Sequence, residues 1–196
     1  SDGHFDSVES LAITPDGKTI ISGSSDNTIK LWNINSGMCV NTLNGHVDSV
    51  NSLVITPDGN IIISGSQDKT IKLWDIQSGE CIKTFDDFDS EISSIVVTQD
   101  GNTMIASHGG IIKLWDIGSG KCIKTIEDDN KINSIAVTNN GQYIVSGSSE
   151  IYEEYIYHGE IILNSYAEIK IWDIESGECI STVEQNTPRD SSIIAL

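Results

Sequence analysis

The stretch TPDGKTIISGSSDNTIKLWNINSGMC, from Thr14 to Cys39, decides the fold, because nearly the same sequence returns from Thr56 to Cys81 as TPDGNIIISGSQDKTIKLWDIQSGEC. Successive tryptophans of the chain are 42, 41 and 57 residues apart, and the last interval is long because the fourth copy carries extra residues between Gly147 and Ile169. A period near 40 residues is typical of stacked or radial repeats. The tryptophans that mark the four copies are Trp32, Trp74, Trp115 and Trp172.

One copy contains four strand patterns and no helical period. In the second copy, Thr56-Pro57-Asp58-Gly59 has the composition of a type I turn and Gln67-Asp68-Lys69 that of a tight connection. Alternation of apolar and polar residues predicts strands on either side of these turns. We therefore expect an all-β chain built of four-stranded antiparallel meanders. The strands predicted for this copy are Val50–Ile55, Asn60–Ser66, Thr70–Ile76 and Glu80–Phe85.

These motifs resemble the Trp-Asp (WD) repeat family of β-propellers, in which a repeat opens with Gly-His and its third strand ends with Trp-Asp. Gly3-His4 and Gly45-His46 open the first two copies, and Trp-Asp or Trp-Asn closes all four. The resemblance implies a β-propeller with four WD-type blades. The expected limits are blade 1 at about 4–44, blade 2 at 46–86, blade 3 at 88–127, blade 4 at 129–184 with an insertion at 150–166, and the start of a fifth blade at 190–196.

Ring closure is the open question of this fold. The family's rings most often hold seven blades, and an unclosed ring would leave two sheet edges exposed. We expect the four blades to be part of a larger ring. A ring completed by a second copy, through self-association of the open blade edges, and a compact four-bladed ring are the alternatives.

The resemblance also implies a buried polar network within each blade, formed by a histidine, a serine, an aspartate and the tryptophan, with a structural role. Blade 3 has Phe88 and Ala106 at the histidine and serine positions, and blade 4 has Asp128 or Asp129 near the histidine position. Loss of the polar partners together is tolerable, because no polar group is then left without a partner. The network residues expected are His4, Ser22, Asp26 and Trp32, then His46, Ser64, Asp68 and Trp74, then Trp115, and finally Ser146 and Trp172.

Composition limits the partners. Against 29 acidic residues there are 11 basic ones, giving a formal charge of −18, and Arg189 is the single arginine. Such a chain repels phosphate backbones and anionic lipid, and no apolar run approaches a membrane span, so we expect neither nucleic acid nor membrane as a partner. Four cysteines, one per repeat, are interpreted as small apolar strand residues with reduced thiols in a cytoplasmic setting rather than as a disulfide or zinc framework.

No catalytic, cofactor-binding or metal site is predicted. His4 and His46 already have structural roles, and His108 and His158 lie beside glycine, which favours solvated turn residues. The Gly-Ser pairs that begin at Gly23 and Gly65 end strands and do not form a phosphate loop. We therefore expect a protein that is not an enzyme and needs no cofactor, with metal-dependent hydrolysis on acidic residues as a minor alternative.

Binding is expected where acidic linkers and the blade 4 insertion share one face of the propeller. The insertion, Glu150 to Tyr166, holds four of the five tyrosines and has the pattern of a protruding hairpin around His158-Gly159. It either binds a partner or packs on its own blade, and the acidic linkers are either a solvated surface, a site for a basic peptide or a calcium site. The partner-binding candidates are Tyr152, Tyr155, Tyr157, His158, Tyr166, Ser7, Glu9, Ser25, Ser49, Asn51, Gln67, Asp87, Asp89 and Glu91.

The sequence thus predicts a non-catalytic scaffold that binds a protein or peptide, including a basic one, on the acidic, insertion-bearing face. The alternative is a sensor or regulatory segment of a larger signalling protein whose catalytic domain lies outside this chain. Fold alone does not decide between them.

Overall fold

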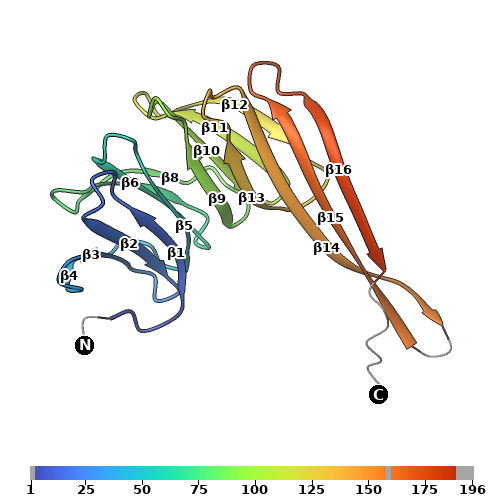
Figure 1. Ribbon diagram of the computed structural model, residues 1–196, viewed down its shortest axis with the longest axis horizontal. Coiled ribbons are helices and arrows are strands. Elements are labelled where there is room, and N and C mark those ends of the chain that lie inside the picture. Colours follow the sequence, from blue (N-terminus) through green and yellow to red (C-terminus); the bar gives the residue numbers. More distant parts are fainter. Residues whose placement is uncertain (1–2, 158–159, 189–196) are drawn as a thin grey trace.

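The computed structural model describes residues 3–157 and 160–188, with side chains described for 3–149 and 167–184. These residues form four antiparallel sheets of four strands each and no helix, which confirms the predicted all-β class. The sheets follow one another as blades 1 to 4 (Figure 1), and their inner strands β1, β5, β9 and β13 contact in that order. The strands of blade 1 are β1 (Val8–Ile13), β2 (Thr19–Ser24), β3 (Ile29–Asn33) and β4 (Cys39–Leu43).

The other three blades repeat this order, and the strands predicted for blade 2 agree with the structure within one residue at each end. Blade 2 consists of β5 (Val50–Ile55), β6 (Ile61–Ser66), β7 (Ile71–Asp75) and β8 (Cys81–Phe85). Blade 3 consists of β9 (Ile92–Val97), β10 (Thr103–His108), β11 (Ile111–Asp116) and β12 (Lys121–Glu127). Blade 4 consists of β13 (Ile132–Val137), β14 (Tyr143–Tyr157), β15 (Glu160–Asp173) and β16 (Cys179–Pro188).

The turn between the first two strands of each blade is held by its own side chains. In blade 2, Thr56 Oγ1 donates to Asp58 Oδ1 at 2.5 Å, and the backbone N–H of Gly59 donates to the Thr56 carbonyl at 2.8 Å. Gly59 has a φ of 75°, a left-handed conformation that glycine adopts without strain. The Thr-Pro-Asp-Gly motif therefore ends one strand and starts the next.

The hydrophobic core lies between blades, not within them. We call each interface between neighbouring blades a joint. In the first joint, Ile29 and Leu31 of blade 1 pack with Leu53 and Trp74 of blade 2. The second and third joints repeat this arrangement around Trp115 and Trp172. Blades 2 and 3 thus bury one face against the blade before and the other against the blade after, whereas blades 1 and 4 each pack one face against a described neighbour. We call these the back face and the front face.

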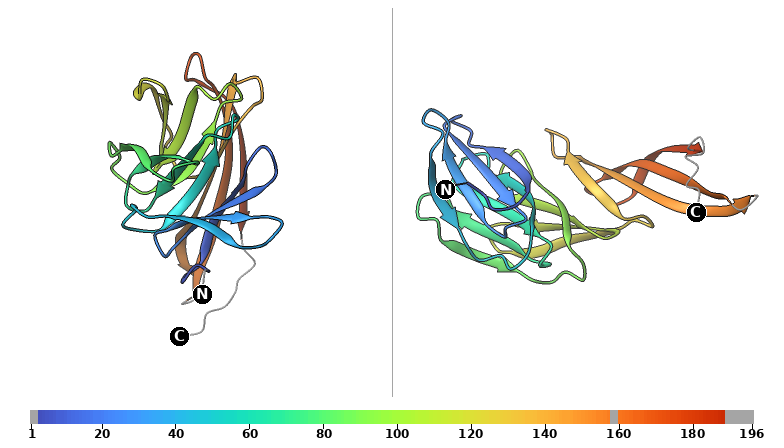
Figure 2. Two further views of the ribbon diagram at one scale, coloured as in Figure 1. Left: turned by 90° about the vertical axis from the view of Figure 1, so that its left-hand side faces the viewer. Right: turned by 90° about the horizontal axis from the view of Figure 1, so that it is seen from below.

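The insertion of blade 4 lengthens the blade's own strands. The β14–β15 ladder runs from Tyr143↔Asp173 to Tyr157↔Glu160, and β16 accompanies β15 as far as Asn164↔Pro188. The right view of Figure 2 shows this hairpin reaching away from the first three blades. The insertion is therefore a hairpin that continues the sheet, rather than two separate short strands. Residues 158–159 and 190–196, with His158 and the expected fifth blade, lie outside the described residues.

The four cysteines are free thiols, one on each outer strand. The cysteines, interpreted as small apolar strand residues, do lie in strands, but Cys81, Cys122 and Cys179 are exposed and Cys39 is partly exposed. Each thiol contacts a threonine hydroxyl three residues further along the outer strand, at 3.5 to 3.8 Å. The outer strand is solvated on that side, because no further strand covers it. The part of the chain that the structure describes contains no helix that could span a membrane.

Candidate functional site

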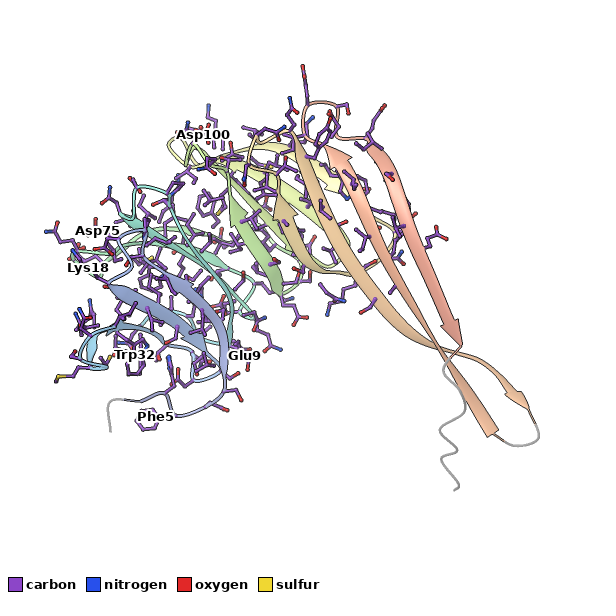
Figure 3. The ribbon with its side chains drawn as sticks, viewed as in Figure 1. Phe5, Glu9, Lys18, Trp32, Asp75 and Asp100 are labelled. Carbon is purple, nitrogen blue, oxygen red and sulfur yellow. The ribbon has the colours of Figure 1, made fainter. Side chains whose placement is uncertain are left out.

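The two ends of the blades differ in what they present. Figure 3 shows Phe5 and Glu9 on the lower side of the molecule, where the β14–β15 hairpin also extends, and Lys18, Asp75 and Asp100 on the upper side. The lower side carries the linkers before each inner strand and the turns between second and third strands. We call it the linker face. All predicted binding residues that the structure describes belong to segments that begin or end there.

Blades 1 and 2 contain the expected polar network. In blade 2, His46 Nδ1 lies 2.8 Å from Asp68 Oδ2 and His46 Nε2 lies 2.7 Å from Ser64 Oγ. Trp74 Nε1 donates to the same Ser64 Oγ at 2.8 Å. Blade 1 repeats these contacts at 2.9, 2.7 and 2.7 Å with its own four residues, His4, Asp26, Ser22 and Trp32.

A serine, a histidine and an aspartate joined by hydrogen bonds resemble a hydrolytic triad, but this one has no accessible nucleophile. Ser64 is fully buried, and its oxygen already accepts the N–H of Trp74. A triad needs a serine oxygen that a substrate carbonyl can reach. The arrangement therefore ties the linker to its sheet, and its role is structural.

The network fixes the protonation of its members. Burial lowers the pKa of His46, against the opposing effect of its hydrogen bond to Asp68. Burial would raise the pKa of Asp68, but hydrogen bonds from Thr70, from the backbone N–H of Val47 and from His46 hold it below its usual range. A neutral imidazole that donates from Nδ1 to Asp68 can accept the Ser64 hydroxyl at Nε2. All three side chains are then satisfied.

Blade 3 replaces the polar network by aromatic packing. Phe88 stands at the histidine position, and its ring centroid lies 5.2 Å from that of Trp115 and 5.1 Å from that of His108. His108 is 2% exposed, so its interpretation as a solvated turn residue is wrong. It ends β10 opposite Ile92, at the position that buried Ser66 has opposite Val50 in blade 2. Burial is the largest cause that lowers the pKa of His108, and its Nε2 has no hydrogen-bond partner.

Blade 4 places a buried ion cluster where blades 1 and 2 have histidine and aspartate. Lys170 Nζ lies 2.6 Å from Asp128 Oδ1 and 3.1 Å from Glu168 Oε2. Asn130 Nδ2 donates to Glu168 Oε2 at 2.7 Å, while Trp172 keeps its bond to Ser146 Oγ at 2.9 Å. Burial alone would lower the pKa of Lys170, but the hydrogen bonds that its ammonium donates to both carboxylates raise it instead. Of the two aspartates considered for the histidine position, Asp128 occupies it.

The sequence analysis did not identify Lys170 as a member of the blade 4 network. Every repeat carries a lysine two residues before its tryptophan, and its partner changes with the network. Lys30 and Lys72 donate to threonines of the outer strand at 3.0 and 3.1 Å. Lys113 instead donates to the Asp87 carbonyl at 2.8 Å and lies over the Phe88 ring. The repetition of lysine inside an otherwise apolar strand was the signal in the sequence.

At the joint of blades 1 and 2, the predicted residues bond to one another. Ser25 Oγ donates to Glu9 Oε1 at 2.8 Å and lies 3.2 Å from Ser49 Oγ, and the Ser25 backbone N–H donates to the Ser7 carbonyl at 2.9 Å. Ser49 is buried, and Asn51 donates to the Ile92 carbonyl at 3.3 Å. Ser7, Glu9 and Ser25 are thus accessible on the linker face, whereas Ser49 and Asn51 hold blades together.

A hollow of about 450 Å³ brings predicted residues of blades 2 and 3 together on the linker face. Lys69 Nζ donates to the Asp89 carbonyl at 2.9 Å, and Lys131 Nζ lies 2.7 Å from Glu91 Oε1. The side chain of Asp87, outside the hollow, lies 3.3 Å from Lys113 Nζ. Lysines therefore offset part of the acidic charge expected here. The lining residues are Gln67, Lys69, Asp89, Ser90, Glu91, Gly109 and Lys131.

Lys69 has a strained backbone at this hollow. Its φ is 65°, in the left-handed region that residues other than glycine and asparagine rarely adopt. Asn27, at the equivalent turn of blade 1, has a φ of 69°. The turn geometry is therefore common to both blades, and only blade 2 places a lysine there.

The ladder register places the insertion's tyrosines. Residues opposite each other in an antiparallel ladder share a face, and neighbours along a strand alternate. The ladder pairs position 152 with 164, position 155 with 162 and position 157 with 160, with a bulge between 153 and 155. The bulge shifts the alternation by one residue. Positions 152, 155, 157 and 166, all tyrosine, therefore lie on one face of the hairpin sheet.

Among the residues that the structure describes, no three histidine, cysteine, aspartate or glutamate side chains come close enough together to hold a metal ion. The expected absence of a metal site stays a prediction for the whole chain.

The comparison with known proteins identifies the repeats. The profile of the WD40 family, described as "WD domain, G-beta repeat", matches residues 1–33, 37–75, 79–116 and 120–150. Periodic tryptophan protein 2 of Saccharomyces cerevisiae is 52% identical over 40 residues, which is 20% of this chain and 4% of that protein. Ribosome biogenesis protein BOP1 homologs of Drosophila grimshawi and Drosophila melanogaster are 49% and 48% identical over 41 residues, 21% of this chain and 5% of each homolog. The matches span one repeat and a small fraction of these curated relatives.

Proposed function

Since the chain belongs to the WD domain, G-beta repeat family, we propose that it is a non-catalytic interaction scaffold that binds a peptide or protein segment on its linker face. The observation that carries the proposal is the hollow between blades 2, 3 and 4. Three separate blades contribute side chains or turns to it, and it contains Gln67, Asp89 and Glu91 of the residues predicted for binding. A concave site lined by several elements is where ligands bind preferentially.

The chemistry of the hollow favours a polar segment with at least one basic group. Asp89 is exposed, and Lys69 donates its hydrogen bond to the backbone carbonyl of Asp89 rather than to the carboxylate. Glu91 shares its charge with Lys131, so the open carboxylate of the hollow is that of Asp89. With the net charge of −18, long-range attraction also selects basic partners.

The structural roles of the histidines in the described networks support the proposal that the scaffold is not catalytic. The histidines of blades 1 and 2 hold structural bonds, and His108 is buried against Phe88. We also propose a cytoplasmic setting, on the cysteine content alone. The relatives match over one repeat, which supports the repeat architecture, so we propose no part in ribosome biogenesis.

The test is a display selection, in which a library of random peptides is selected for binding to the purified chain. The affinities of the selected peptides are then measured by titration. The decisive variant is Asp89→Lys, because it inverts the exposed carboxylate of the hollow. Glu80→Lys is the matched control: Glu80 is exposed, and its carbonyl accepts the Asp75 N–H at the opposite end of the blade. We expect enriched basic residues and at least a tenfold, or about 1.4 kcal/mol, weaker binding for Asp89→Lys only. Equal binding to both variants, or no enrichment, would refute the proposal.

A further inference from the structure

A second hollow, of about 560 Å³, lies in the first joint on the side opposite the linker face. It opens beside the turn of Lys18, which Figure 3 shows on the upper side. Leu31 and Ile76 belong to the apolar cluster of this joint, and Val40, 59% exposed, continues it to the surface. All its lining residues lie between positions 14 and 77, within two complete blades. We call it the first-joint hollow, and its size is that of a ligand site.

Each of the two blades adds one carboxylate to the first-joint hollow, Asp16 from blade 1 and Asp58 from blade 2. Asp16 Oδ2 lies 3.6 Å from Lys18 Nζ, and both side chains are exposed. Asp58 accepts hydrogen bonds from two neutral residues, Thr56 and Asn60, at 2.5 and 2.7 Å. These bonds, that from Thr56 first, hold the pKa of Asp58 below its usual range. The hollow therefore combines apolar surface with an ionised carboxylate that no cation neutralises.

The second and third joints place a lysine of the chain itself where the first joint has Asn41. A Cβ added at Gly120 would lie 1.6 Å from Lys83 Nζ, so this ammonium rests on the turn of blade 3. Lys124 reaches across to blade 4, where its Nζ donates to the Glu175 carbonyl. The ladders show that these positions are equivalent, with Asn41 opposite Leu31, Lys83 opposite Leu73 and Lys124 opposite Leu114.

The lysine of the second joint carries its charge to the next blade. Hydrogen bonds from Ser119 lower the pKa of Asp116, and the charge of Lys83 adds to this effect. In the first joint, Asn41 rests on Gly79 in the same way, with its Nδ2 2.6 Å from an added Cβ, but an amide carries no charge. The first joint thus lacks the lysine that the chain supplies across the next two.

The third joint shows the opposite combination. Its hollow, of about 420 Å³, has Asn140 at the position that Asp58 has in the first joint. Lys124 crosses this joint, so it has one carboxylate fewer than the first joint and one cation more. Of the three described joints, the first is therefore the one with a hollow whose charge calls for a cation from outside.

We propose that the first-joint hollow binds a lysine or arginine side chain of a partner protein. The head group lies at Asp58, where a charge-assisted hydrogen bond is available, and the methylene stem lies on Leu31 and Val40. This occupant follows from charge complementarity, because the partner supplies the cation that Lys83 and Lys124 supply in the other joints. The site lies on the side opposite the linker face, so the scaffold has two separate binding surfaces.

A display selection of random peptides against the Asp89→Lys chain tests this site apart from the linker face, because that variant inverts the exposed carboxylate there. We expect selected peptides to contain lysine or arginine, and replacement of that residue by norleucine to weaken binding about tenfold or more. A selection that enriches no basic peptide overturns the proposal. It leaves the linker-face proposal standing, since the selected chain carries Asp89→Lys.

Adding Asn41→Lys to the Asp89→Lys chain is the decisive change, because it gives the first joint the lysine of the next two joints. The fold accepts lysine at this position in blades 2 and 3, and circular dichroism checks that the variant folds. Asn44→Lys is the matched control, since it adds the same charge at an exposed residue just beyond the linker end of β4. We expect the selected peptides to bind about tenfold or more weakly to the Asn41→Lys chain, and within about twofold of the parent affinity to the Asn44→Lys chain. Equal weakening by both changes would indicate long-range attraction alone and overturn the proposal, as would binding that neither change weakens.

Discussion

Replacing Ser64 by alanine should be the most informative single change, because one hydroxyl serves both the histidine and the tryptophan of blade 2. Ser64 Oγ lies 2.7 Å from His46 Nε2 and 2.8 Å from Trp74 Nε1. All three residues are buried, so water cannot replace the lost hydroxyl. The variant leaves one acceptor and one donor without partners.

Each buried group left unpaired costs about 1–3 kcal/mol. A neutral His46 that still donates from Nδ1 to Asp68 has an acceptor at Nε2 that no donor reaches in the variant. For two such groups we therefore expect Ser64→Ala to lower the free energy of unfolding by about 2–6 kcal/mol, a large part of the roughly 5–15 kcal/mol typical of a domain. Urea unfolding followed by circular dichroism measures this difference.

Ser22→Ala in blade 1 is the matched control. It breaks the same contacts, at 2.7 Å each, but Trp32 is only partly buried because none of the four described blades covers the back face of blade 1. Water can then reach the released indole N–H, and the expected loss is smaller, about 1–2 kcal/mol. Equal losses for the two variants, or a loss below about 1 kcal/mol for Ser64→Ala, would refute the argument that burial sets the cost.

Three further changes test the networks of blades 2 to 4. The fold lowers the pKa of His108 below its ordinary value of about 6.5, which applies to the unfolded chain. As the pH drops from 7 to 5, the unfolded chain therefore binds this proton first, and stability should fall. His108→Phe should flatten that fall by up to about 1.4 kcal/mol per pH unit in urea unfolding at several pH values, and an unchanged slope would contradict it. Lys170→Met leaves Asp128 and Glu168 buried without a cation, so we expect a loss of about 3–5 kcal/mol, and a loss under about 1 kcal/mol would show that water relieves the carboxylates. Lys69→Asn relieves the left-handed backbone and should raise the melting temperature with a gain of about 0.5–1 kcal/mol, whereas a lower melting temperature would show that the Lys69–Asp89 bond outweighs the strain.

The described part of the candidate site was predicted unevenly, and His108 and Lys170 show why. The linker face and its carboxylates follow from the repeat register, since every repeat places its linker at the same end. The burial of His108 depends on its place opposite Ile92 in the sheet and on the Phe88 ring packed against it, neither of which the residues beside it specify. The ion cluster of Lys170 needs Asp128, 42 residues earlier, and such a pairing exists only after the sheet has formed.

The sequence by itself determined that this chain repeats a four-stranded antiparallel unit four times, because turn chemistry and alternating burial are local properties that Thr-Pro-Asp-Gly and Ile-Lys-Leu-Trp encode within a few residues. The tertiary structure alone decided which groups are buried between blades. Gly23 and Gly147 hold the same position in the second strand, yet an added Cβ would lie 2.6 Å from Val50 at Gly23 and, among the described residues, would meet only the Ser134 carbonyl oxygen at Gly147. Burial depends on the neighbouring blade, which the residues of the motif do not specify.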